Sequence, residues 1–90
     1  MPGYPNLEPS DEFFRSLFDG HFSRAEREQL LKALRLLDEN ERHPSLRVHQ
    51  LKGPLAGVWS ASASASLRIT FERLPEGRKR LVEASRHYGD

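Results

Sequence analysis

The stretch that decides the fold is residues 51–71, Leu-Lys-Gly-Pro-Leu-Ala-Gly-Val-Trp, then Ser-Ala-Ser-Ala-Ser-Ala-Ser, then Leu-Arg-Ile-Thr-Phe. It opens with a Gly-Pro turn signal. From Val58 onward serines alternate with tryptophan or alanine, and over residues 67–72 apolar residues alternate with polar ones. A period of two is typical of pleated strands. The stretch therefore predicts a β-hairpin that bends near residues 63–66 and has one apolar face for the rest of the chain to cover.

Two amphipathic helices are predicted ahead of this hairpin. Ser10 is a suitable N-cap for a helix over about residues 10–19, and Ser23 with Glu26 has the spacing of a capping box for a helix from 24 to about 38. We expect Asn40 to end the second helix in the left-handed conformation. The apolar stripes predicted to face the core are Phe13, Phe14, Leu17 and Phe18 in the first helix and Leu30, Leu31, Leu34 and Leu37 in the second.

Further strands are predicted on both sides of the hairpin. Residues 46–49 alternate and lead into it, and residues 81–86 form the last strand. Residues 4–7 can form only an edge or very short strand, because Pro5 has no N–H to donate. The order predicts one α+β domain over residues 1–90, in which a helix hairpin packs on a mainly antiparallel four-stranded sheet.

Composition and charge indicate which kinds of site and partner the chain can have. The chain has no cysteine, and its four histidines lack ligand spacing, so we expect neither a metal site nor a cofactor. No apolar run approaches the ~20 residues of a membrane span, and there is no signal pattern, so we expect a cytoplasmic protein without membrane contact. Residues 1–41 hold five Lys/Arg against nine Asp/Glu, whereas residues 42–90 hold nine against four. A basic half favours an anionic partner, although drift of surface charge gives the same pattern.

The groups able to do chemistry are imidazoles and cations. Taken singly, each has an ordinary structural interpretation; Arg68, for example, could pair with Glu72 or Glu83. Taken together, they suit cleavage of RNA by its own 2′-OH, which needs a base, an acid and a cation on the phosphate but no metal. His49 and His87 would supply the first two, and Arg68 would bind the phosphate. The other basic groups predicted to contact RNA are Arg47, Lys52 and Arg86.

Three segments carry a resemblance to a known family. Residues 41–46 (Glu-Arg-His-Pro-Ser-Leu), residues 49–60, and Leu-Arg-Ile-Thr-Phe at 67–71 resemble the RelE/ParE toxin superfamily, and within it the YafQ-like and plasmid stabilisation branch. The resemblance covers roughly residues 10–88. It implies the RelE fold, a bacterial cytoplasmic protein and a cognate antitoxin that wraps around the toxin. For the RelE/YafQ side it also implies metal-independent cleavage of mRNA in the ribosomal A site.

The resemblance also implies residue roles. Arg68 matches the strand arginine that contacts the scissile phosphate, and His87 matches the carboxy-terminal histidine that acts as general acid or base. His49 matches a second histidine of the branch, and Trp59 a structural tryptophan. The sequence departs from the family at the Ser-Ala run of residues 62–65, where polar or basic groups are usual, and at Ser85, where glycine is customary.

Three functions stay open at this point. A ribosome-dependent mRNA endonuclease requires Arg68 and His87 to converge on one open concave face. A ParE-like gyrase inhibitor needs no catalytic histidine and would interact through its helices. A catalytically inert module that binds an antitoxin, or a second copy of itself as a homodimer, would have a site filled by small or apolar groups.

Overall fold

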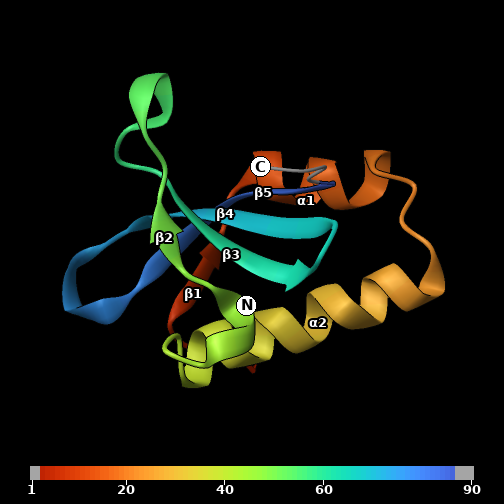
Figure 1. Cartoon of the computed structure of the whole chain (residues 1–90), viewed down its shortest axis with the longest axis horizontal. Coiled ribbons are helices and arrows are strands. Elements are labelled where there is room, and N and C mark those ends of the chain that lie inside the picture. Colours follow the sequence, from red (N-terminus) through yellow and green to blue (C-terminus); the bar gives the residue numbers. More distant parts are fainter. Residues whose placement is uncertain (1–2, 87–90) are drawn as a thin grey trace.

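The computed structural model describes residues 3–86 as one five-stranded sheet with two helices (Figure 1). The elements are β1 (Leu7–Pro9), α1 (Asp11–Asp19), α2 (Arg24–Glu39), β2 (His49–Gln50), β3 (Trp59–Ser64), β4 (Leu67–Arg73) and β5 (Lys79–Arg86). The strand order is β1-β5-β4-β3-β2, in which β1 runs parallel to β5 and all other pairs are antiparallel. The α+β expectation is confirmed, with a fifth strand, β1, at the edge of the sheet.

The helix starts form as their capping signals predict. The Ser10 hydroxyl accepts the Phe13 N–H at 3.1 Å, and Ser23 and Glu26 cap each other reciprocally. The expectation of a left-handed Asn40 is wrong, since its φ is −157°. Its side-chain oxygen instead accepts the Arg42 N–H at 3.2 Å, which makes a local turn that an extended Asn40 can form.

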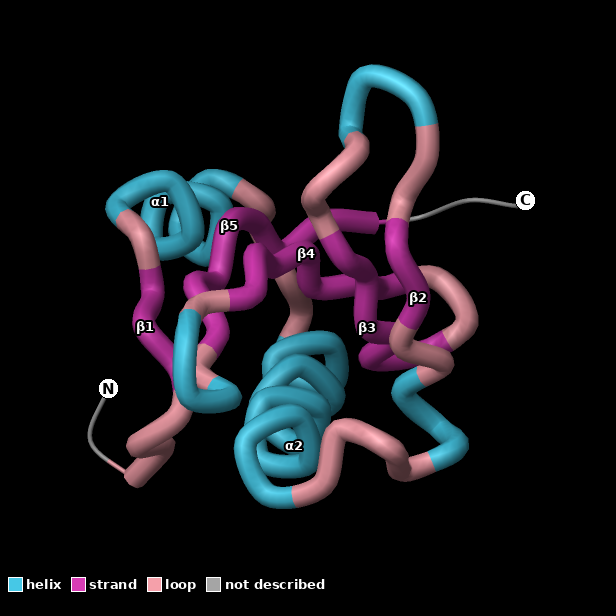
Figure 2. The backbone as a smooth tube through the Cα atoms, turned by 90° about the vertical axis from the view of Figure 1, so that its left-hand side faces the viewer, coloured by secondary structure: helices cyan, strands magenta, loops and turns pink. Residues whose placement is uncertain are grey.

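The two helices take different positions relative to the sheet (Figure 2). Helix α2 packs on β3 and β4, whereas α1 lies beside β5, where the Ser16 hydroxyl accepts the Ala84 N–H at 2.9 Å. Because α1 sits towards the edge of the sheet, only Phe13 of its apolar stripe is buried. In α2, Leu31 is 56% exposed, so the expectation that it faces the core is wrong. The second apolar row of each helix has no sheet surface to pack against.

The central hairpin forms where it was predicted, with its bend inside residues 63–66. Strand β3 ends at Ser64 and β4 begins at Leu67, with Trp59 opposite Phe71 and Ser62 opposite Arg68. The apolar members of the alternation are buried on the helix side: Ala61, Leu67, Ile69 and Phe71. Ser60 and Ser62 of β3 and Arg68, Thr70 and Glu72 of β4 consequently share the opposite face of the sheet.

The segments flanking the hairpin differ from expectation. Pro44–Leu46 is a 3₁₀ turn, not the start of a strand, because the His43 Nδ1 caps the Ser45 N–H and Pro44 suits the first turn position. Arg47 then adopts a left-handed conformation, with φ 46° and ψ 46°, so that β2 holds only two residues. At the other edge, β1 lies at Leu7–Pro9, later than the expected residues 4–7.

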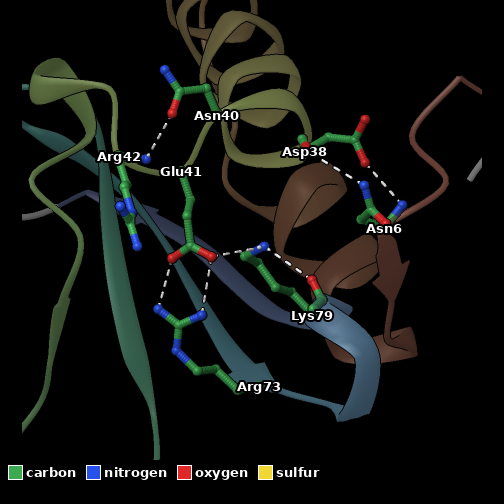
Figure 3. A network of polar contacts seen from close by, with 8 residues as sticks. Asn6, Asp38, Asn40, Glu41, Arg42, Arg73 and Lys79 are labelled. Carbon is green, nitrogen blue, oxygen red and sulfur yellow. Dashed lines mark hydrogen bonds and ion pairs between the residues drawn. The ribbon is translucent and has the colours of Figure 1, made fainter.

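A charged network joins the end of α2 to β4 and β5 (Figure 3). Glu41 accepts two hydrogen bonds from Arg73, at 2.7 and 3.1 Å, and pairs with Lys79 at 3.2 Å. The Arg73 guanidinium also stacks over the Trp59 ring at 4.1 Å from its centroid. The hydrogen bonds from Arg73, followed by those from Lys79, lower the pKa of Glu41 to about 2. The network holds the start of the segment that leads to β2.

Candidate functional site

A hollow of about 630 Å³ lies on the face of the sheet that α2 does not cover. Its lining brings together residues from the turn before β2, from β2 itself, and from the β3–β4 hairpin. They are Pro44, Ser45, Arg47, His49, Ser60, Ser62, Ala63, Ser64, Ala65 and Arg68. Three of the sequence-predicted site residues therefore meet in one place.

The register explains why this part of the sheet is hollow. His49 on β2 pairs with Ser60 on β3, and Ser62 on β3 pairs with Arg68 on β4. With strands about 4.8 Å apart and a rise of about 3.3 Å per residue, the Cα atoms of His49 and Arg68 lie about 12 Å apart. The positions between them carry only serine, which leaves room for their longer side chains to reach a common ligand. The Ser-Ala run therefore creates the hollow.

Arg68 lies in this hollow without an acceptor from the described part of the chain. Its side chain is half-buried, it makes no hydrogen bond or ion pair with residues 3–86, and its Nε is buried without a partner. The alternative of a pair with Glu72 is not realised, since Glu72 pairs with Arg80 at 3.4 Å. A guanidinium has five N–H donors and no acceptor, and leaving it unpaired away from water is costly. The arrangement suits an oxyanion ligand.

His49 is held in one tautomer by its own turn. Its Nδ1 lies 2.8 Å from the carbonyl oxygen of Arg47. A carbonyl can only accept, so Nδ1 carries the proton, and Nε2 of the neutral ring is left with a lone pair. The left-handed backbone of Arg47 belongs to the same turn that presents this carbonyl. His49 is exposed and can accept a proton at Nε2 from a group bound in the hollow.

The other predicted RNA contacts divide between the hollow and the rest of the surface. Arg47 lines the hollow, whereas Lys52 is exposed on the β2–β3 loop and is not part of its lining. Arg86 is engaged elsewhere: it donates to the Gly20 carbonyl at 2.7 Å and to Glu26 at 2.9 Å. It thereby joins β5 to the turn between the helices, and the structure does not bring it to the hollow. His87 lies outside the described residues.

Sequence reasoning missed the serine hydroxyls of the site. Ser60 and Ser62 line the hollow beside Arg68, and their strand alternation was the signal that places them on its face.

Within residues 3–86, no group of three or more His, Cys, Asp or Glu is placed to hold a metal ion. None of the helices in the described part is long and apolar enough to cross a membrane.

A second surface feature is an apolar groove of about 760 Å³ between α1 and α2. It exposes three large hydrophobic side chains, Phe14 at 43%, Phe18 at 81% and Leu31 at 56%. The rest of the groove is formed by Leu17, His21, Phe22, Arg27, Leu30 and Leu34. Exposed apolar surface gathered in this way marks an interaction site more often than a chance cluster.

Comparison with solved structures shows that the fold is shared with YafQ and with a YoeB/ParE toxin, although no family model and no curated protein matches the sequence. YafQ from E. coli strain BL21(DE3) matches with a TM-score of 0.73 and 16% identity over 89% of this chain and 90% of that one. HP0894 from Helicobacter pylori matches with a TM-score of 0.69 and 16% identity, over 91% and 93%. The YoeB/ParE toxin from Agrobacterium tumefaciens matches with a TM-score of 0.64 and 22% identity, over 92% and 99%. At these identities the similarity establishes the fold only. Any statement about activity has to be argued from the residues of the hollow.

Proposed function

We propose that this chain is the toxin component of a toxin–antitoxin pair and that it cleaves ribosome-bound mRNA in the hollow beside Arg68, without a metal ion. The observation that carries the proposal is a half-buried arginine with no acceptor in residues 3–86, in the same hollow as an imidazole whose Nε2 is free to accept a proton. The fold supports it, since structures of the same fold include YafQ and the RelBE2 toxin–antitoxin complex from Mycobacterium tuberculosis.

The chemistry is a transesterification within the RNA. Arg68 binds the non-bridging oxygens of the scissile phosphate and stabilises the charge that builds up there. His49 Nε2 takes the proton from the 2′-OH, the 2′-oxygen bonds to phosphorus, and the bond from phosphorus to the 5′-oxygen breaks. The products are a 2′,3′-cyclic phosphate and a 5′-hydroxyl. The proton for the leaving oxygen is assigned to His87 by resemblance, and that role stays a prediction.

Two other functions are weighed against this one. An inert binding module would have its site filled by small or apolar groups, whereas here the small residues leave an open hollow lined by Arg47, His49 and Arg68. A ParE-like gyrase inhibitor would act through its helices, and the apolar groove between α1 and α2 is the observation that favours it. The arginine without an acceptor favours the nuclease, because a gyrase inhibitor has no use for it.

The same groove supports a protein partner for the toxin. A segment that covers it needs an apolar face for Phe14, Phe18 and Leu31, and carboxylates to meet His21 and Arg27, which also line the groove. An acidic amphipathic helix of the cognate antitoxin has this chemistry. The solved E. coli DinJ–YafQ toxin–antitoxin complex has a toxin chain that matches this one with a TM-score of 0.68, which supports a partner of this class.

The test combines growth arrest with cleavage. Wild type, Arg68→Ala, Arg68→Lys and His49→Ala are induced in bacteria, and purified proteins are assayed for single-turnover cleavage of ribosome-bound mRNA, with breaks mapped by primer extension. Arg68→Ala should cleave at least about 100-fold more slowly and His49→Ala about 10²–10⁴-fold more slowly. The control Arg35→Ala, an exposed arginine on α2, should stay within about threefold of wild type. Cleavage by Arg68→Ala within threefold of wild type contradicts the proposal, and arrest without cleavage favours the gyrase alternative.

A further inference from the structure

Three strands place one row of hydrogen-bond donors across the open face of the sheet. Ser62 on β3, Arg68 on β4 and Ser85 on β5 are direct register partners. Side chains of directly opposed residues share a face and lie side by side. The row therefore has a cation at its centre and a hydroxyl on each side.

The row lacks acceptors in the described part of the chain. Arg68 Nε and Ser85 Oγ are the buried side-chain atoms without a hydrogen-bond partner within residues 3–86, and the Ser62 hydroxyl makes no hydrogen bond there. By contrast, the neighbouring Thr70 hydroxyl on this face donates to the Glu83 carbonyl at 3.3 Å. Buried polar groups are almost always paired in folded proteins. Arg68 Nε and Ser85 Oγ, on directly opposed residues, are a donor and an acceptor that can satisfy each other. The outer guanidinium nitrogens and the Ser62 hydroxyl then have no acceptor within residues 3–86, which indicates that a ligand supplies it.

We propose that Ser62, Arg68 and Ser85 form a phosphodiester-binding subsite, an inference that rests on the proposed function and adds two positioning residues to it. The Arg68 guanidinium takes the non-bridging oxygens of a phosphate group, and the Ser62 hydroxyl donates a further hydrogen bond to the same group from β3. The Ser85 hydroxyl is available to accept the Arg68 Nε–H, and it thereby sets the plane of the guanidinium. The groups that face the ligand, the outer guanidinium nitrogens of Arg68 and the Ser62 hydroxyl, donate to phosphate and contact no base, so the ligand is recognised by its backbone.

The experiment measures binding apart from cleavage. The full chain is titrated with a fluorescent 2′-O-methyl oligoribonucleotide, which lacks the attacking hydroxyl, and inorganic phosphate is then added as competitor. The variants are Ser62→Ala, Ser62→Thr and Ser85→Ala. The matched control is Ser66→Ala, which makes the same change in the same hairpin at an exposed residue outside the lining of the hollow.

Loss of one hydrogen bond to a charged ligand corresponds to about tenfold in Kd. Ser62→Ala should raise Kd for the oligonucleotide about tenfold without a change in melting temperature, while Ser62→Thr, which keeps a hydroxyl and suits a strand, stays within twofold of wild type. Ser85→Ala should raise Kd at least threefold, Ser66→Ala less than twofold, and phosphate should compete with the oligonucleotide.

Equal effects of Ser62→Ala and Ser66→Ala overturn the subsite, as does a Ser62→Thr protein that binds as weakly as Ser62→Ala. Failure of wild type to bind either probe also overturns it, even if induced cells arrest and mRNA is cleaved. The opposite result is also possible: Kd changes in the Ser62 variants as predicted, but wild type neither arrests growth nor cleaves mRNA. That result supports the subsite and refutes the nuclease.

Discussion

Replacement of Glu41 by glutamine should destabilise the protein in a manner that depends on pH. The pKa of Glu41 is lowered from its ordinary value of 4.5 to about 2 by Arg73 and Lys79, a difference of about 2.5. Unscreened, this corresponds to about 3 kcal/mol of stability. The Glu41 and Arg73 side chains are 28% and 38% exposed, so solvent screening reduces the expected contribution to about 1–3 kcal/mol. Lys79, which is only 4% exposed, would lose its charged partner in the variant.

The direction of this pH dependence follows from the lowered pKa of Glu41. A carboxyl whose pKa is lower in the folded state stabilises the fold above about pH 4.5, and this contribution is lost as the pH falls towards 2. Urea unfolding at pH 7, 5, 4 and 3 should show a gap of about 1–3 kcal/mol between wild type and Glu41→Gln at pH 7, narrowing below pH 4.5.

Glu72→Gln is the matched control, because the Glu72–Arg80 pair is 44% and 49% exposed and should contribute at most about 1 kcal/mol. The reasoning is refuted if Glu41→Gln costs no more than Glu72→Gln at pH 7, or if its gap from wild type stays constant down to pH 3.

Two further predictions concern the helices. Leu34→Ala should cost about 2–5 kcal/mol, because Leu34 is 2% exposed in the core, whereas Leu31→Ala at a 56% exposed position should change the melting temperature little; a shift of less than a degree for Leu34→Ala would contradict its burial. Phe18→Glu combined with Leu31→Glu should prevent a co-expressed cognate antitoxin from neutralising growth arrest. Leu55→Glu, on the β2–β3 loop away from the groove, should leave neutralisation intact, and equal behaviour of the two variants would rule out the groove as the antitoxin surface.

The parts of the fold predicted from sequence are those specified by local chemistry. Ser10, Ser23 and Glu26 act within one helical turn, so their capping could be predicted, and the alternation of residues 58–71 fixed which side of the sheet Arg68 occupies. The left-handed conformation of Arg47 had no comparable signal in the sequence. It follows a 3₁₀ turn that Pro44 and the His43 ring stabilise, and this turn takes the place of the strand expected there.

The less predictable parts of the site depend on distant contacts or on small side chains. Arg86 was expected at the RNA, but its partners lie in the turn between the helices, 66 residues away at Gly20. Ser62 and Ser85 carry no distinctive chemistry as isolated residues. They become informative only when the register places them on both sides of a cation.

The position of β5 between β1 and β4 has a consequence for the time at which the proposed phosphate subsite is completed. Strand β5 supplies Ser85 to the row around Arg68, and Ala84 hydrogen-bonds to Ser16 across 68 residues of chain. Contacts of such sequence separation form slowly and require the later segment to be available. During synthesis, the helices and the β3–β4 hairpin can form before β5 has been made, but the proposed subsite around Arg68 cannot. An RNA would therefore meet the complete row of Ser62, Arg68 and Ser85 only after β5 has been translated.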